Sequence, residues 1–184
     1  MTYQILFCSI FLREYDLAEI DKLKKENEDL KNELEGLKET VAVYLGSLIR
    51  EVVRDFGNRG KETVKEAARK GGLWQGQKYI RENNVKEKGT KAAADFFSSM
   101  SDVELFQVKT EMLSDKKFHI KTNVCPYIRI WKEMGIDKEL PEFCILATYY
   151  DLGLCQAFNP DLKINLPVDM MRGCDHCVYE LYEE

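Results

Sequence analysis

Hydrophobic residues recur at alternating spacings of three and four between residues 20 and 44, as in helices that pair with one another. The repeated positions, called a and d, are Ile20, Leu23, Asn27, Leu30, Leu34, Leu37, Val41 and Tyr44. The residues that flank this stripe are Glu19, Glu26 and Glu33 on one side and Lys24, Lys31 and Lys38 on the other.

These flanking charges indicate the kind of partner. In a parallel dimer each of the glutamates faces the lysine five positions further on in the second helix, so the charges are opposite at every pair. A single Asn at an a position, here Asn27, favours two strands. We therefore predict a parallel dimeric coiled coil over residues 13–44, with the homodimer held through 20–44. The alternative is a lone amphipathic helix that packs on its own domain.

The helical stripe continues beyond the heptads. Apolar residues at helical spacing extend it through Arg54, and Gly57 and Gly60 predict its end. A second helix is predicted over 61–70, ending at Gly71-Gly72, and one or two short helices over 73–99.

The pattern changes after Met100, where alternating hydrophobic and polar residues predict strands over 103–109 and 118–124, with a turn at Ser114-Asp115. A short helix is predicted from Pro126 to Gly135 and a longer one over 141–158. The last strands are predicted over 162–168 and 177–182. The fold class is therefore α+β: residues 45–99 are helical, and residues 100–184 form an antiparallel β-β-α-α-β-β domain.

Composition excludes several classes of partner. The net charge of −5 and the even mixture of both signs do not predict a nucleic-acid partner. The apolar segment 4–12 is too short to span a bilayer and lacks the features of a secretory signal, so we expect a cytoplasmic protein with reduced thiols and no membrane partner. That segment is either a buried end of the fold or a small contact with a membrane or partner.

The residue types that carry chemistry gather near the end of the sequence. Cys144, Thr148, Asp151 and Cys155 fall within about 60° of one another on the helix predicted over 141–158. A face that packs in a core should carry Leu or Ile, so this small and polar face predicts the wall of a cavity. Cys144 and Cys155 would lie about 16 Å apart along a continuous helix, too far to act on one atom.

A metal centre is the alternative use of the thiols. Cys174 and Cys177 form a C-x-x-C, which is half of a zinc or iron–sulfur site or a redox pair. Cys125 and Cys144 could complete a set of four thiolates, or could be ordinary buried thiols. The two histidines, His119 and His176, are either solvated or, for His176, a ligand or proton carrier.

One set of motifs resembles a known family. It runs C-P, W-K-E-M-G, E-F-C, D, F-N-P and M-x-x-G-x-x-x-C-x-Y, at Cys125-Pro126, 131–135, 142–144, Asp151, 158–160 and 170–179. In this order the motifs resemble the L-2-amino-thiazoline-4-carboxylic acid hydrolase family over residues 41–182. The G-x-x-x-C turn followed by an aromatic is also similar to the 4-vinyl reductase-type small-molecule-binding domains, some of which hold zinc near that cysteine.

The resemblance implies an activity, the hydrolytic opening of a cyclic amidine-like thiazoline to a carbamoyl-cysteine type product. It implies that Cys144 is the nucleophile or key thiol and that Asp151 is the base or orienting group. Thr148, Asn159 and Cys125 would contact the substrate, although Asn159-Pro160 is equally well explained as a turn that ends a helix.

Two hypotheses therefore follow. The first is a hydrolase that opens a small cyclic C–N or C–S substrate with a thiol and carboxylate site. The second is a dimeric small-molecule sensor or metal-binding module, in which Cys125, Cys144, Cys174 and Cys177 hold zinc or an iron–sulfur cluster.

Overall fold

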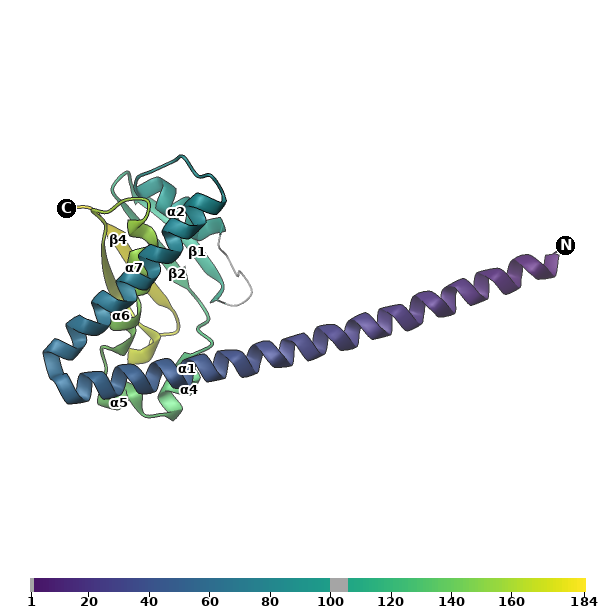
Figure 1. Cartoon of the computed structure of the whole chain (residues 1–184), viewed down its shortest axis with the longest axis horizontal. Coiled ribbons are helices and arrows are strands. Elements are labelled where there is room, and N and C mark those ends of the chain that lie inside the picture. Colours follow the sequence, from purple (N-terminus) through teal and green to yellow (C-terminus); the bar gives the residue numbers. More distant parts are fainter. Residues whose placement is uncertain (1, 100–105) are drawn as a thin grey trace. The chain divides into compact units, whose positions relative to one another are not determined.

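The structure is a computed structural model that describes residues 2–99 and 106–184, with side chains described for 17, 19–99 and 106–184. It divides into two units, Met1–Val41 and Ala42–Glu184. The helices are α1 (Thr2–Glu82), α2 (Thr90–Ser99), α4 (Ile128–Glu133), α5 (Ile136–Glu139), α6 (Phe143–Ala147), α7 (Tyr149–Gln156) and the short 3₁₀ helix η1 (Met170–Arg172) (Figure 1). The strands are β1 (Val108–Ser114), β2 (Lys117–Thr122), β3 (Lys163–Val168) and β4 (Cys177–Tyr182).

The four strands form one antiparallel sheet in the order β1-β2-β4-β3, which confirms the α+β fold class. Phe118, Ile120 and Thr122 of β2 are all buried, as their alternation with polar residues predicted. Strand β4 has the predicted bounds. The first strand was predicted over 103–109, but β1 begins at Val108, and residues 103–105 lie outside the described residues.

The first unit contains only α1, and it confirms the predicted helix over 20–41 but does not test its pairing. The apolar segment 4–12 belongs to this helix, and its side chains lie outside the described residues. No helix in the described part of the chain is long and apolar enough to cross a membrane.

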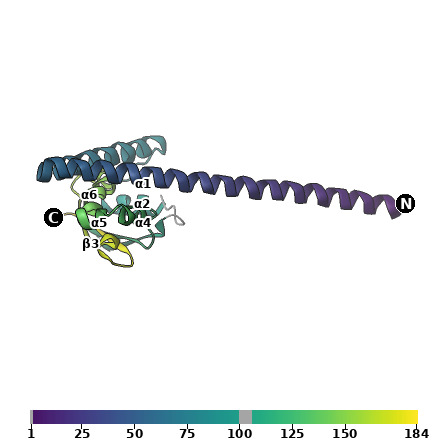
Figure 2. The ribbon, with the colours of Figure 1, turned by 90° about the horizontal axis from the view of Figure 1, so that it is seen from below.

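In the second unit, α1 bends at Gly57, whose φ of 54° and ψ of −131° are not helical. A positive φ of this size is accessible mainly to glycine, so the glycine sets the bend. The two arms of α1 that meet there are residues 42–56 and 58–82. Figure 2 shows this part of α1 on one side of the domain and strand β3 on the other.

The helix end predicted at Gly71-Gly72 is wrong, because α1 continues through both residues to Glu82. Here the glycines allow two helices to touch. A Cβ atom at Gly72 would overlap the Tyr150 carbonyl oxygen, and one at Gly153 of α7 would lie 2.7 Å from the Leu73 nitrogen. The missing side chains let the backbones of α1 and α7 approach closely, which fixes α7 against the second arm.

The single helix predicted over 141–158 is divided into α6 and α7 at Thr148. The Thr148 hydroxyl donates a hydrogen bond of 2.9 Å to the Ile145 carbonyl within the last turn of α6. The short helix predicted from Pro126 is confirmed as α4, and Gly135 ends it in the left-handed conformation with φ of 74°.

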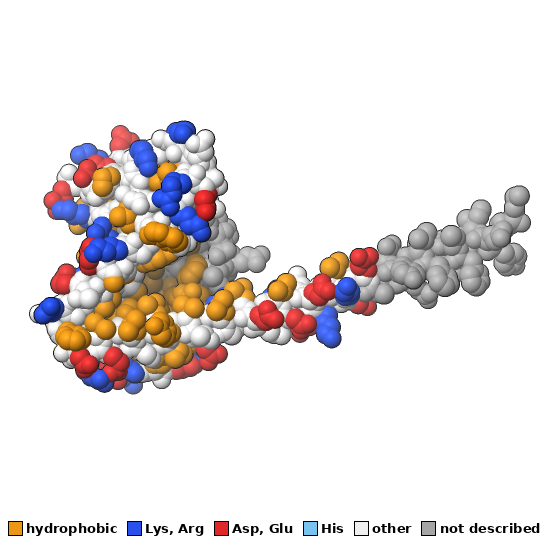
Figure 3. Space-filling view, viewed as in Figure 1, with side chains coloured by type: hydrophobic (Ala, Val, Ile, Leu, Met, Phe, Trp, Pro, Cys, Tyr) orange, Lys and Arg blue, Asp and Glu red, His pale blue; other side chains and the backbone are white. Residues whose placement is uncertain are grey.

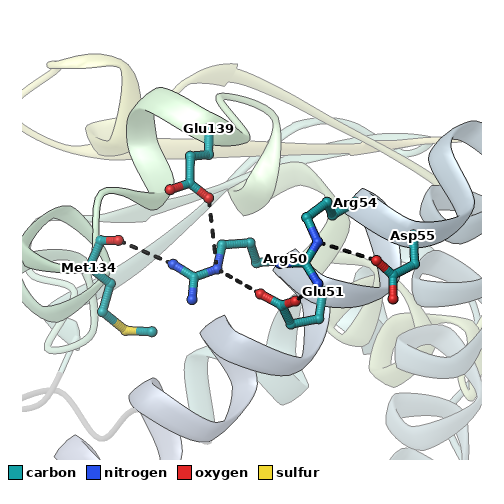
Figure 4. Close-up of polar contacts among 6 residues, drawn as sticks. All are labelled: Arg50, Glu51, Arg54, Asp55, Met134 and Glu139. Carbon is teal, nitrogen blue, oxygen red and sulfur yellow. Dashed lines mark hydrogen bonds and ion pairs between the residues drawn. The ribbon is translucent and has the colours of Figure 1, made fainter.

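The first arm of α1 is fixed to the domain by Trp131 and Arg50. Trp131 is buried, and its indole N–H donates a 2.9 Å hydrogen bond to the Ala42 carbonyl. The Arg50 guanidinium donates to the Met134 carbonyl at 3.3 Å and lies 3.8 Å from the Glu139 carboxylate (Figure 4). These contacts from α4 and α5 hold the arm that forms one wall of the cavity described below.

Candidate functional site

The second unit encloses a cavity of about 400 Å³. Figure 3 shows a hollow surrounded by hydrophobic side chains on the face of the domain that it presents. Side chains from both layers of the domain, the helices and the sheet, line the cavity. The lining residues are Leu45, Phe97, Phe106, Val108, Ile120, Thr122, Cys125, Tyr127, Ile128, Trp131, Cys144, Ala147, Thr148, Tyr150, Asp151, Leu154, Cys177 and Tyr179.

Asp151 is the charged residue in this lining, and it lies in the first turn of α7. Removal of its carboxyl group from water raises its pKa from 3.8 to about 7. Desolvation disfavours the ionised form, and the cause here is burial alone. The carboxyl group can therefore accept or release a proton near neutral pH, which a general base requires.

Three thiols share the cavity, those of Cys125, Cys144 and Cys177. Burial raises the pKa of Cys125 from 9.0 to about 11 and raises that of Cys144 still further. It also raises the pKa of Cys177, whose sulfur accepts a 3.3 Å hydrogen bond from the Met170 N–H. All three thiols are consequently protonated at neutral pH, so none of them is a ready thiolate nucleophile.

The structure brings four of the predicted site residues together. Cys125, Cys144, Thr148 and Asp151 all line the cavity, so the small polar helix face does form a cavity wall. Cys155, on the same predicted face, is fully buried in the core and is not among the residues that line the cavity.

Asn159, predicted to contact substrate, lies outside the cavity lining. Its amide nitrogen donates to Thr90 Oγ1 at 2.9 Å and to Glu183 Oε1 at 2.8 Å, and its oxygen accepts from the Asp161 N–H at 3.1 Å. These contacts join the turn after α7 to the start of α2, which agrees with the alternative role as a turn residue.

The four thiols of the predicted metal centre do not lie in one place. Cys174 is exposed and does not line the cavity that Cys125, Cys144 and Cys177 share. Among the described side chains, those of 17, 19–99 and 106–184, no group of three from His, Cys, Asp or Glu is arranged to hold a metal ion. Of the two histidines, His119 contacts Glu180 at 3.1 Å and His176 contacts Asp175, and neither lines the cavity.

Sequence reasoning missed the aromatic part of the site. Tyr127, Trp131, Tyr150 and Tyr179 line the cavity, and burial raises the pKa of Tyr179 well above its usual value. The alternation of Cys177 and Tyr179 along β4 places both on one face of the sheet, and this spacing could have assigned Tyr179 to the wall. Tyr127, Trp131 and Tyr150 come from elements other than β4, so no local spacing could have assigned them to the same cavity.

The fold is a helix-covered antiparallel sheet domain that encloses a mainly apolar cavity. Residues 37–181 match the L-2-amino-thiazoline-4-carboxylic acid hydrolase family. The chain belongs to this family, as the motifs around Cys125, Cys144 and Cys177 predicted. No curated protein matches the chain.

Two solved structures share the fold at low sequence identity. One is a trafficking protein particle complex subunit 3 from Naegleria fowleri, described as covalently bound to palmitic acid. Its identity is 11%, its TM-score is 0.54, and the match covers 80% of this chain and 95% of that one. The other is an H-NOX protein from S. oneidensis in the Fe(II)NO ligation state, with 14% identity, a TM-score of 0.52 and coverages of 76% and 74%. At these identities the likeness shows the fold alone.

Proposed function

We propose that the protein is a hydrolase that opens a small cyclic substrate containing an amidine-like carbon, with Asp151 as the general base. The observation that carries the proposal is a carboxyl group with a pKa of about 7 in the wall of a mainly apolar cavity. Family membership supports hydrolysis as the type of reaction.

The lining indicates the class of substrate. Leucine, isoleucine and aromatic side chains around the cavity favour a ligand with an apolar body. The ionised Asp151 carboxylate favours a basic nitrogen, because a cation or hydrogen-bond donor beside it offsets the cost of burying its charge. A ring whose C–N carbon also bears an amino group meets both requirements.

The proposed reaction uses one water molecule. Asp151 in its carboxylate form takes a proton from the water while the water oxygen bonds to the ring carbon. As water adds, the electron pair of the C=N bond moves onto the ring nitrogen. The bond between the carbon and its ring nitrogen or sulfur then breaks, the departing atom takes the proton from Asp151, and the hydroxyl proton of the new C–OH group passes to the ring nitrogen. The ring carbon becomes a carbonyl, and Asp151 returns to its starting charge.

Cys144 has a different role in this proposal from an attacking thiolate. Its pKa is raised first by burial and then by the nearby Asp169, so the neutral thiol dominates at any physiological pH. A neutral S–H is a weak donor that can orient the ring sulfur or nitrogen. Thr148 and Cys125, which also line the cavity, offer further polar contacts to the substrate.

The test compares two 2-amino-thiazolines, one with a 4-carboxylate and one with an alkyl group in its place. Loss of substrate with gain of one water is followed by mass spectrometry. We expect faster hydrolysis of the alkyl compound, because the carboxylate would lie near the like charge of Asp151. Asp151→Asn should lower kcat/KM by at least about a hundred-fold and remove a rise in rate centred near pH 7.

Asp115→Asn, on the exposed turn between β1 and β2, is the matched control and should hydrolyse at the wild-type rate. Full turnover by Asp151→Asn would refute the assignment of the base. Turnover of neither compound, with saturable binding of the alkyl compound, would instead support a small-molecule sensor.

A further inference from the structure

The a and d positions of the heptad carry exposed hydrophobic side chains. Leu23, Leu30 and Leu37 are 58%, 64% and 60% exposed, and no described contact covers them. The seam that they form also includes Ile20, Leu34, Val41 and Tyr44. A soluble chain rarely exposes so many large apolar residues in one line, so this face is expected to meet another surface.

The second unit shows that α1 uses a different face to pack on its own domain. Ala42, Ile49 and Val53 are buried, whereas Tyr44 and Leu48 are 71% and 50% exposed. At 100° per residue the two sets are about 140° apart around the helix. Packing of residues 42–53 on the domain therefore leaves Tyr44 and Leu48 exposed, and Leu48 occupies the a position that follows Tyr44 in the heptad.

The charges beside the seam match those of a second copy in one orientation. In a parallel pair Glu19, Glu26 and Glu33 face lysines, whereas an antiparallel pair would place glutamate against glutamate and lysine against lysine. In the single chain Lys24 and Lys38 contact Asp21 and Glu35 of their own helix, at 3.5 and 2.6 Å. The Lys24–Asp21 contact is exposed and therefore weak, so Lys24 can turn toward a partner, whereas the Lys38 side chain is only 12% exposed.

We propose that residues 19–48 pair with the same residues of a second copy as a parallel, in-register, two-stranded coiled coil. Asn27 then meets Asn27 of the other copy and sets both register and strand number. The proposal is independent of the reaction in the cavity.

The first experiment measures the mass of the full chain by sedimentation equilibrium. We expect a dimer at micromolar concentration. Leu30→Glu, which places two charges inside the seam, should weaken the dimer by at least about a hundred-fold. Asn32→Glu, on the outer face of the same turn, is the matched control and should leave the dimer intact. A monomeric wild type, or equal effects of the two substitutions, would overturn the proposal.

A second experiment tests the charges and the orientation. Changing Lys24, Lys31 and Lys38 to Glu should prevent self-association, and so should changing Glu19, Glu26 and Glu33 to Lys. The two variants mixed should form a heterodimer. In a background with Cys8 and Cys174 changed to Ser, Asn27→Cys should form a disulfide between copies under mild oxidation that the background chain does not form. Self-association of either charge variant, or a dimer without the residue 27 crosslink, would refute the parallel register.

Discussion

Replacing Asp151 by Asn should make the stability of the protein less dependent on pH. Asn has nearly the same shape as Asp but cannot ionise, so the substitution removes the charge and keeps the volume. Because burial raises the pKa of Asp151 from 3.8 to about 7, the folded protein holds a proton there that the unfolded chain has released.

The sign and size of the effect follow from this difference. The folded state binds more protons than the unfolded state between about pH 4 and pH 7, so the free energy of unfolding falls as the pH rises through that window. A pKa difference of about three corresponds to at most about 4 kcal/mol. Since Asp151 keeps partial exposure to the cavity, we expect about 2–4 kcal/mol between pH 4 and pH 8.

The assay is urea unfolding at pH 4 and pH 8, followed by tryptophan fluorescence, on wild type, Asp151→Asn and the Asp115→Asn control. The difference in the free energy of unfolding between the two pH values should be smaller in Asp151→Asn than in the other two by that amount. At pH 8 Asp151→Asn should be more stable than wild type, because wild type then carries a buried carboxylate.

The reasoning fails if Asp151→Asn keeps the pH dependence of wild type. Such a result would mean that the carboxyl group is hydrated in the folded protein. The cavity would then be wet, and Asp151 would not have the proton affinity that the proposed hydrolysis requires.

Two further predictions concern packing and thiol exposure. Gly72→Ala should destabilise the domain by about 2 kcal/mol or more in thermal unfolding, because the new methyl group overlaps the Tyr150 carbonyl, whereas Gly36→Ala has free space and should stabilise its helix slightly. Among the cysteines whose side chains the structure describes, iodoacetamide at pH 8 should modify the exposed Cys174 first and the buried Cys144 only after unfolding, as read by peptide mass spectrometry. Early modification of Cys144 would show an open cavity.

Local patterns predicted the sheet well because its strands carry their own signal. The alternation around Phe118 and the run from Cys177 to Tyr182 each identify one buried face without reference to other elements. The glycines led to a wrong helix end at Gly71-Gly72, because the role of a glycine depends on what packs against it in the folded protein. Gly72 allows α1 to approach α7 closely, whereas Gly57 bends α1. The sequence around each glycine does not distinguish these two roles.

The candidate site also has features that local sequence spacing predicts and features that depend on distant parts of the chain. Cys144, Thr148 and Asp151 are close in sequence, so helical spacing placed them on one wall correctly. The pKa of Asp151 and the state of the thiols depend on side chains from other elements, which no local spacing reveals. Asn159 looked like a substrate contact because it belongs to a family motif, but its hydrogen bonds to Thr90 and Glu183 show that a motif residue can serve the fold.

The strand order has a consequence for synthesis of the protein on the ribosome. Strand β4 lies between β2 and β3, so the strand made last supplies the centre of the sheet. The sheet cannot close, and the cavity cannot lose its water, until that strand has emerged. The seam of residues 19–48 emerges far earlier and needs only local structure to fold. Two neighbouring nascent chains could therefore associate before either has a folded domain, and selection of a partner would precede formation of the site.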